Sequence, residues 1–275
     1  MNPLYITSSL IGVTLLGLLF AQDGAQQKPS NIVPEHTKHL PTDRNGTALW
    51  ENDPRFPNDT FQFVRMKAEN HSEWATDYPD SDLNFSFRLQ QMTSLKVNPH
   101  PIVVSPTDPK LKECPFLYTL ETATLQLTPK EITALREYFN TGGFLMIDDF
   151  WGDRAWDNTV KEMKKIFPDK EIKELKLDHP IFNIVFPIKE KPQIPAIGFA
   201  VSNRYTGITS PSVGGPPNFY GIYDDKGRMM VLICRNTDLG DGWEREGEDP
   251  YYFKAFSEKS AYPLGINIIV YMMTH

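Results

Sequence analysis

Two adjacent carboxylates, Asp148 and Asp149, stand where a buried strand should end. They follow the apolar run 144–147 directly and lead into Trp151. In an open parallel sheet the ligand crevice lies beyond the carboxyl ends of the strands, so at least one carboxylate should point into its mouth. Two close carboxylates push their pKa values apart and suit oxygen-ligated metal binding or acid–base chemistry. The alternative is that one carboxylate caps the following helix and the other is solvated.

Two other loops place acidic side chains beside aromatic ones. Residues 74–82 join an expected strand to a helix, and residues 236–244 follow another apolar strand. The second loop is dense in oxygen ligands but lacks EF-hand spacing, so a turn closed by a buried tryptophan is the favoured interpretation. Aromatic rings beside carboxylates suit carbohydrate or cation recognition, and they suit a packed loop equally. The ligand-binding candidates are Trp74, Asp77, Tyr78, Asp148, Asp149, Trp151, Asn236, Asp238, Asp241, Trp243 and Glu244.

Three of these acids, Asp148, Asp149 and Asp241, are the candidate metal ligands, because carboxylate oxygens bind hard divalent cations. A divalent cation is the cofactor that the sequence suggests, and no other is indicated. The catalytic candidates are Asp148, Asp149 and His179. His179 precedes a proline in a candidate lid, and we expect it near these loops as the one histidine that could act as a general base.

Two cysteines, Cys114 and Cys234, limit the remaining chemistry. They cannot form a zinc site by themselves, although one disulfide between them stays open. Cys234 ends an expected strand, but Arg235 and Asn236 follow it rather than a small residue that opens a helix. The sequence also lacks a G-x-S-x-G elbow, a P-loop, an H-E-x-x-H motif and a glycine-rich dinucleotide turn. Thiol catalysis is therefore not expected.

The elements that must position these residues alternate between strands and helices. Residues 128–131 form a capping box with proline at the first helical position, and the glycine pair 142–143 ends that helix. The run 144–147 follows at once, and its continuous hydrophobicity indicates a parallel strand covered on both faces. We therefore predict an α/β fold, with a mostly parallel sheet and helices on both faces.

Further elements are predicted on either side of this unit. Asp80 or Ser81 should cap a helix with an apolar stripe, and the turn 224–227 should join an antiparallel hairpin. The C-terminal segment 260–273 is apolar nearly all round, which indicates a buried helix. Residues 175–218 carry seven prolines and little periodicity, which indicates a long irregular insertion or lid over one end of the sheet. Short strands are expected at 61–66, 102–104, 116–118, 221–223 and 229–234.

The beginning of the chain differs from the rest. Residues 1–21 contain no charged side chain and end in a small residue, so we expect a signal peptide and export to the periplasm or cell envelope. Because no Lys or Arg precedes the apolar run, an uncleaved helix that anchors the protein to the cytoplasmic membrane is the alternative. Membrane contact is expected only through this segment. Residues 22–59 are predicted to be a polar, proline-rich arm, and residues 60–275 a single α/β domain.

The charge balance argues against nucleic acid as a binding partner. With 35 acidic against 28 basic residues the net charge is -7, and no basic stripe offsets it. Non-specific affinity for nucleic acid comes from clustered Lys and Arg, so a nucleic-acid partner is not expected. An unknown small ligand or a cell-envelope protein is the expected partner.

A series of short motifs runs through the chain in a fixed order, at 63–65, 74–79, 115–118, 142–145, 148–150, 179–181, 236–244 and 265–267. Their order and spacing resemble the bacterial domain-of-unknown-function 4159 family over about residues 61–275. That family is similar to the flavodoxin-like folds of class I glutamine amidotransferases, and its members tend to be exported or membrane-associated. The resemblance implies an α/β fold and brings no known reaction. The amidotransferase cysteine on a tight strand-to-helix elbow has no counterpart here, so its chemistry is not carried over.

Three functions are compatible with these residues. The leading hypothesis is a non-catalytic ligand-binding or scaffolding domain outside the cytoplasmic membrane, with an acidic and aromatic crevice and no nucleophile. The second is a hydrolase in which Asp148, Asp149 and either Asp241 or His179 hold a divalent ion that activates water. The third is a polysaccharide-binding module, suggested by the aromatic residues near acids.

Overall fold

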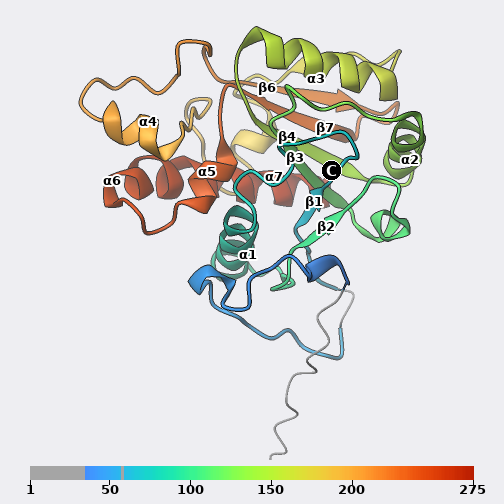
Figure 1. Cartoon of the computed structure of the whole chain (residues 1–275), viewed down its shortest axis with the longest axis horizontal. Coiled ribbons are helices and arrows are strands. Elements are labelled where there is room, and N and C mark those ends of the chain that lie inside the picture. The colour runs from blue at the N-terminus through green and yellow to red at the C-terminus, as the bar shows by residue number, and fades with distance from the viewer. Residues whose placement is uncertain (1–34, 57–58) are drawn as a thin grey trace, which may run out of the picture. The chain divides into compact units, whose positions relative to one another are not determined.

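An open seven-stranded sheet forms the centre of the computed structural model, which describes residues 35–56 and 59–275 (Figure 1). The strand order is β2-β1-β3-β4-β7-β6-β5. Five neighbouring strands from β2 to β7 are parallel, and β6 and β5 extend the sheet by antiparallel pairing. The predicted α/β fold is confirmed. The strands are β1 Val64–Met66, β2 Ile102–Val104, β3 Phe116–Leu120, β4 Phe144–Phe150, β5 Lys173–Glu174, β6 Asn218–Tyr223 and β7 Met229–Arg235.

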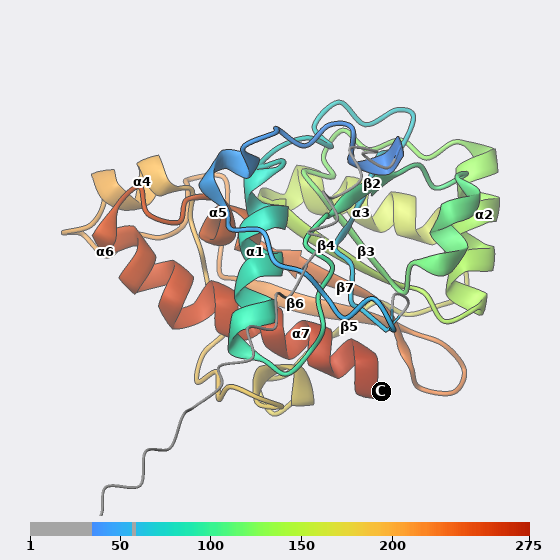
Figure 2. The same cartoon turned by 90° about the horizontal axis from the view of Figure 1, so that it is seen from below.

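Helices cover both faces of this sheet (Figures 1 and 2). They are α1 Asp80–Met92, α2 Pro129–Asn140, α3 Gly152–Ile166, α4 Ile197–Ser202, α5 Leu239–Glu244, α6 Pro250–Tyr252 and α7 Tyr262–Thr274. Successive side chains of a strand point to opposite faces. In β4, Phe144 and Met146 join the core under α1, α5 and α7, whereas Leu145 and Ile147 join the core under α2 and α3. The continuous hydrophobicity of this strand is thus explained by burial on both sides.

The capping box predicted for α2 is present. The Thr128 hydroxyl accepts a hydrogen bond from the Glu131 backbone N–H (3.4 Å), and Glu131 Oε2 accepts one from the Thr128 N–H (2.9 Å). Gly142, at φ 107°, then turns the chain into β4. Local sequence therefore sets both ends of this helix.

Helix α1 begins where it was predicted, but its predicted cap is wrong. Its N-cap is Pro79, which offers no side-chain bond. The two residues expected to cap it have other partners, because Asp80 accepts a hydrogen bond from Asn45 and the Ser81 hydroxyl accepts one from Arg65. The buried Arg65 therefore engages one of the two expected caps, and Asn45 engages the other.

The predicted hairpin joins β6 to β7, and the predicted irregular insertion lies between β5 and β6. The insertion contains α4 and a single short 3-10 turn, Pro180–Phe182. Ile194 exchanges hydrogen bonds with the loop after β7, accepting from the Asp238 N–H and donating to the Thr237 hydroxyl, both at 3.0 Å. This part of the insertion therefore lies over the C-terminal ends of the parallel strands.

The C-terminal helix is buried as predicted, but helical structure begins about ten residues earlier, at α6. A π-helical segment, Phe253–Ala261, leads directly into α7. Upstream of the sheet, the chain before β1 contacts the strand region, since Trp50 donates from its indole nitrogen to the Val97 carbonyl (2.8 Å). Within the described part of the chain, no helix has the length and apolar character needed to cross a membrane. The predicted leader, residues 1–21, lies outside the described residues.

The two cysteines are free and buried. Cys114 belongs to the core under α2 and α3, and Cys234 to the core under α1, α5 and α7. The sheet lies between them, which explains why the disulfide left open by the sequence does not form.

Candidate functional site

Six carboxyl side chains gather at the C-terminal edge of the parallel strands. The loop between β1 and α1 supplies one, the end of β4 supplies two, and the segment from the end of β7 through α5 supplies three. All six were ligand-binding candidates in the sequence. This set, called here the carboxylate cluster, consists of Asp77, Asp148, Asp149, Asp238, Asp241 and Glu244.

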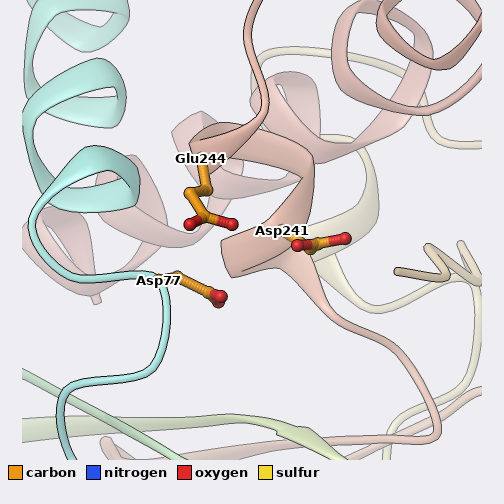
Figure 3. A group of neighbouring side chains, drawn as sticks. All are labelled: Asp77, Asp241 and Glu244. Carbon is orange, nitrogen blue, oxygen red and sulfur yellow. The ribbon is translucent and has the colours of Figure 1, made fainter. Parts of the chain in front are cut away.

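Two overlapping triads within the cluster have the spacing of a cation shell. In the outer triad, Asp77 faces Asp241 and Glu244 of α5 (Figure 3). In the inner triad, Asp77 is joined by Asp149 and Asp238. Each triad offers three carboxylate oxygens that lie within 4.8 Å of one another. Asp77 belongs to both triads, so it is the central ligand candidate of the site.

The Asp77 loop is held in place by Arg65, a fully buried residue of β1. The guanidinium forms a two-pronged ion pair with Asp82, also fully buried. It also donates to the backbone carbonyls of Trp74 (3.2 Å) and Thr76 (2.7 Å). Because both carbonyls lie in the loop just before Asp77, the arginine fixes the path of that loop. The matched pair with Asp82 satisfies both buried charges.

Asp148 is a fully buried member of the cluster, and only one of its two carboxylate oxygens has hydrogen-bond partners. Its Oδ2 accepts from the Tyr118 hydroxyl (3.1 Å) and the Gly240 backbone N–H (3.0 Å). Its Oδ1 is buried without a hydrogen-bond partner. Gly240 also adjoins Asp77, because a Cβ on that glycine would lie 2.6 Å from Asp77 Oδ2. The buried carboxylate therefore adjoins the centre of the cluster, and an unsatisfied oxygen there is costly unless a ligand meets it.

The neighbouring Asp149 turns toward the edge of the sheet at a bulge in β4. The strand register shifts between residues 147 and 150, and Asp149 adopts φ 44°. Its Oδ1 accepts a hydrogen bond from the Trp151 indole nitrogen (3.2 Å). β-Bulges re-aim side chains in this way beside functional sites.

Asp238 and Asp241 belong to the start of α5. Asp238 is the N-cap, and its Oδ1 accepts from the Asp241 N–H (2.7 Å). Asp241 Oδ2 accepts from the backbone N–H of Ile197, in the insertion (2.6 Å). Arg245 approaches from the next turn and lies 2.6 Å from Glu244 Oε2 and 3.6 Å from Asp241 Oδ1. The insertion and α5 together fix the outer triad.

Burial raises the pKa of every carboxyl in the cluster. It raises the pKa of Asp77 to about 7 with help from the Asp241 charge, and that of Glu244 to about 8 with help from Asp77. For Asp148, burial raises the pKa to about 7 although the bonds from Gly240 and Tyr118 oppose the rise. The pKa values of Asp149, Asp238 and Asp241 are raised, first by burial and, for Asp149 and Asp238, then by neighbouring acids. Negative charge is therefore held in this space at a cost, and protons or cations relieve it.

Strained backbone is concentrated at the same edge. Four non-glycine residues beyond or within the ends of β1, β3, β4 and β7 have positive φ, at 60° for Asp77, 47° for Glu121, 44° for Asp149 and 57° for Asn236. Each such residue costs of order 1–3 kcal/mol and persists where the surroundings over-determine it. Such clusters are found at ligand sites and active sites.

Comparison with known proteins identifies the family. The family described as a domain of unknown function, DUF4159, matches residues 60–273. The chain belongs to the DUF4159 family. No curated protein compared with it matches. The matched range contains the whole carboxylate cluster of this DUF4159 domain.

The aromatic candidates of the DUF4159 domain have structural partners. Trp243 is 1% exposed, and its ring packs against that of Phe85 with a centroid separation of 4.4 Å. It therefore anchors the segment 236–244 in the hydrophobic core. Trp74 is half-buried, next to Tyr78 and under the Lys67 ammonium. These rings therefore stabilise the segments that carry the acidic residues of the cluster.

Asn236 links the loops rather than joining the cluster. Its backbone N–H donates to the Phe150 carbonyl (3.0 Å), and its Oδ1 accepts from the Gly152 N–H (2.9 Å). Its side-chain nitrogen reaches the Pro216 carbonyl in the insertion (3.1 Å). It therefore ties β4, α3 and the insertion together at the rim of the site.

His179 lies away from these loops, contrary to the expectation from sequence. Its ring contacts the Tyr223 hydroxyl (3.2 Å) and lies beside Tyr271. Tyr223 ends β6, which runs antiparallel to β7, and it pairs with Met229 at the beginning of β7. The histidine is thus at the end of the sheet opposite Asp148, because the antiparallel strand reverses the direction of the chain.

Four residues that matter to the site were not candidates. Arg65 and Tyr118 stood out only as members of family-like motifs, although a charged residue inside an apolar strand signals a buried ion pair. Glu121 follows β3 as the other acids follow their strands, and its N–H donates to the Asp149 carbonyl (3.0 Å). Nothing in the sequence marks Gly240, whose role depends on contacts between loops far apart in the chain.

The donor set of the cluster fits a hard divalent cation. Both triads consist of carboxylate oxygens alone, which are the ligands of Ca²⁺, Mg²⁺ and Mn²⁺ rather than of thiophilic metals. A cation would also satisfy the buried oxygens that lack a hydrogen-bond partner, Oδ1 of Asp148 and Oδ2 of Asp77.

Proposed function

We propose that this DUF4159 domain is a binding domain that holds a divalent cation in its carboxylate cluster and recognises its ligand or partner there. The observation that carries the proposal is the convergence of carboxylates from three separate segments of the chain around Asp77. Loops at the C-terminal edge of a parallel sheet are the usual location of ligand sites in α/β proteins.

The charge of the site supports a cation. The pKa of each of the six carboxyls is raised, and the nearest basic groups are already engaged. Arg65 is paired with Asp82, and Arg245 is shared between the outer triad and Glu248. A cation would relieve the repulsion that protons relieve in its absence.

The experiment that tests this proposal is thermal unfolding of the purified protein, first in chelator and then with Ca²⁺, Mg²⁺ or Mn²⁺. An ion at 100 times its Kd stabilises the folded state by about 2.7 kcal/mol. For a domain of this size that corresponds to a rise in Tm of about 5–10 °C. No rise in Tm with any of the three ions refutes the proposal.

A metal-assisted hydrolase is the second candidate. It is supported by the pKa of Asp148, which burial raises to about 7, because a carboxylate poised near neutrality beside a cation suits acid–base work. The discriminating assay offers esters, amides and glycosides to the cation-loaded protein. Turnover that is lost in the double variant Asp148→Asn, Asp149→Asn would replace the binding proposal with this one, and absence of turnover leaves the binding function.

We also propose a flavodoxin-like fold relationship and a location outside the cytoplasm. The five parallel strands run in the order 2-1-3-4-5 when numbered along the chain, which supports a flavodoxin-like and amidotransferase-like relationship. Export through residues 1–21, or anchoring by them, would place the site outside the cytoplasm, where a small ligand or cell-envelope protein would be its partner. Fractionation of cells that express the full chain tests this location.

A further inference from the structure

We infer that the carboxylate cluster holds two divalent cations rather than one, with Asp77 as the bridging ligand. The inference rests on the proposed function, since it concerns the number and arrangement of ions in that site. It specifies an inner ion held by Asp77, Asp149 and Asp238 and an outer ion held by Asp77, Asp241 and Glu244.

The geometry of the triads points to a bridge. Each triad alone has its three ligand atoms within 4.8 Å of one another, and Asp77 is the residue common to both. A carboxylate has two oxygens and can bind one ion through each of them. Paired ions in such sites lie about 3.5–4 Å apart and share ligands.

Charge compensation also favours more than one ion when the carboxylates are ionised. The cluster contains six carboxylates when fully ionised, and Arg245, the basic side chain in ion-pair contact with it, is shared with Glu248. One divalent cation would leave more than half of that negative charge uncompensated in a largely buried space. A second cation brings the site close to neutrality, which is what burial of charge demands.

Asp148 supplies an independent sign of a ligand. It is fully buried, its Oδ1 has no hydrogen-bond partner, and its other oxygen is bonded to Gly240 next to Asp77. A buried polar atom without a partner indicates an ion or water that completes its coordination. Asp148 belongs to neither triad, so its unsatisfied oxygen is a separate observation in the same cluster.

The two ions should differ in affinity. The inner ligands Asp149 and Asp238 are 5% and 4% exposed, and no basic side chain forms an ion pair with either among the described residues. The outer ligands Asp241 and Glu244 both lie within 4.0 Å of the positively charged Arg245. A cation in the outer position is therefore repelled by a neighbouring charge, and we expect the inner position to fill first.

Mn²⁺ binding to the whole protein tests this arrangement. Equilibrium dialysis counts the ions per chain, and electron paramagnetic resonance detects the magnetic coupling of two adjacent Mn²⁺ ions. We expect two ions, coupled, with at least a tenfold difference in Kd. Asp238→Asn should remove the tighter ion, and Glu244→Gln should remove the weaker one. Asparagine is as good an N-cap as aspartate, so the first variant keeps the start of α5.

The control is Asp157→Asn, which alters an exposed acid of α3 and should leave both ions bound. Circular dichroism of each variant verifies folding. Two uncoupled ions, or a single ion per chain, would overturn the bridged pair while leaving cation binding intact. Absence of any bound Mn²⁺ would overturn the proposed function itself, so the two failures are distinguishable.

Discussion

Replacing Asp148 by asparagine should stabilise the cation-free protein. Asparagine is nearly the same shape, and its carbonyl oxygen can accept the bonds from Tyr118 and Gly240 that Asp148 Oδ2 now accepts. Its amide NH₂ would stand at the position of the oxygen that has no hydrogen-bond partner. The substitution therefore removes a buried negative charge and retains the hydrogen bonds that the aspartate makes.

The size of the effect follows from the pKa of Asp148. Burial first, then the nearby Asp77 charge, raises that pKa from 3.8 to about 7, although hydrogen bonds to the carboxylate oppose the rise. The folded state thus binds the proton more tightly than the unfolded state, and stability is lost as the pH rises from about 4 to about 7. At about 1.4 kcal/mol per pKa unit, this carboxyl costs about 4 kcal/mol at pH 8, where it is buried in the ionised form. At pH 5 it costs about 2 kcal/mol, because it must take up a proton when the protein folds. The asparagine variant escapes both costs.

Urea unfolding in chelator at the two pH values is the assay. The variant should exceed the wild type by several kcal/mol at pH 8 and by about half as much at pH 5. Added Mn²⁺ should stabilise the variant less than the wild type, because the site has lost a negative charge. Asp157→Asn, on the surface of α3, is the matched control and should change stability by less than about 0.5 kcal/mol. A variant less stable than the wild type at pH 8 would refute the assignment of Asp148 as a strained, unsatisfied carboxylate.

Three further outcomes are expected. Gly240→Ala should weaken cation binding about tenfold or more, because its Cβ would lie 2.6 Å from Asp77 Oδ2. Gly198→Ala is the control and should leave cation binding unchanged, because a Cβ there meets nothing within 4 Å. Isothermal titration with Mn²⁺ measures the affinity of both variants. Arg65→Met should cost about 3–5 kcal/mol in urea unfolding, since it leaves the buried Asp82 without its cation, and a loss below 1 kcal/mol would contradict this role. Both cysteines, buried and unpaired, should react with a thiol reagent only after denaturation, and rapid reaction of the native protein would contradict their burial.

The sequence predicted those parts of the site that depend on local signals. The apolar run before Asp148 and Asp149 predicts the end of a strand near them; the strand in fact includes both acids and ends one residue after Asp149. Asp241 and Glu244 were candidates because oxygen ligands are dense around them. The α2 capping box and the β6–β7 hairpin were predicted for the same reason, since neighbouring residues specify them.

What could not be predicted depends on contacts between distant segments. The central position of Asp77 arises because Arg65, twelve residues earlier, holds its loop over the strand ends. The sequence-based metal set therefore omitted it. The sequence predicts His179 near the site because the proline-rich segment reads as a single lid over one end of the sheet. The insertion in fact spans both ends of the sheet, since β5 pairs with an antiparallel strand and Ile194 lies far along the chain at the other end.

Several unfavourable features of this domain coincide at one edge of the sheet. Positive φ at four non-glycine residues, six carboxyls with raised pKa values and an unsatisfied buried oxygen all lie at the C-terminal ends of the parallel strands. At the opposite end, the β6–β7 turn is closed by Asp224, which accepts hydrogen bonds from the Lys226 and Arg228 backbone N–H groups. If the acids served stability, their amide variants would unfold more easily. The cluster predicts the reverse, because a sheet buried on both faces can support local strain that only a bound ligand relieves.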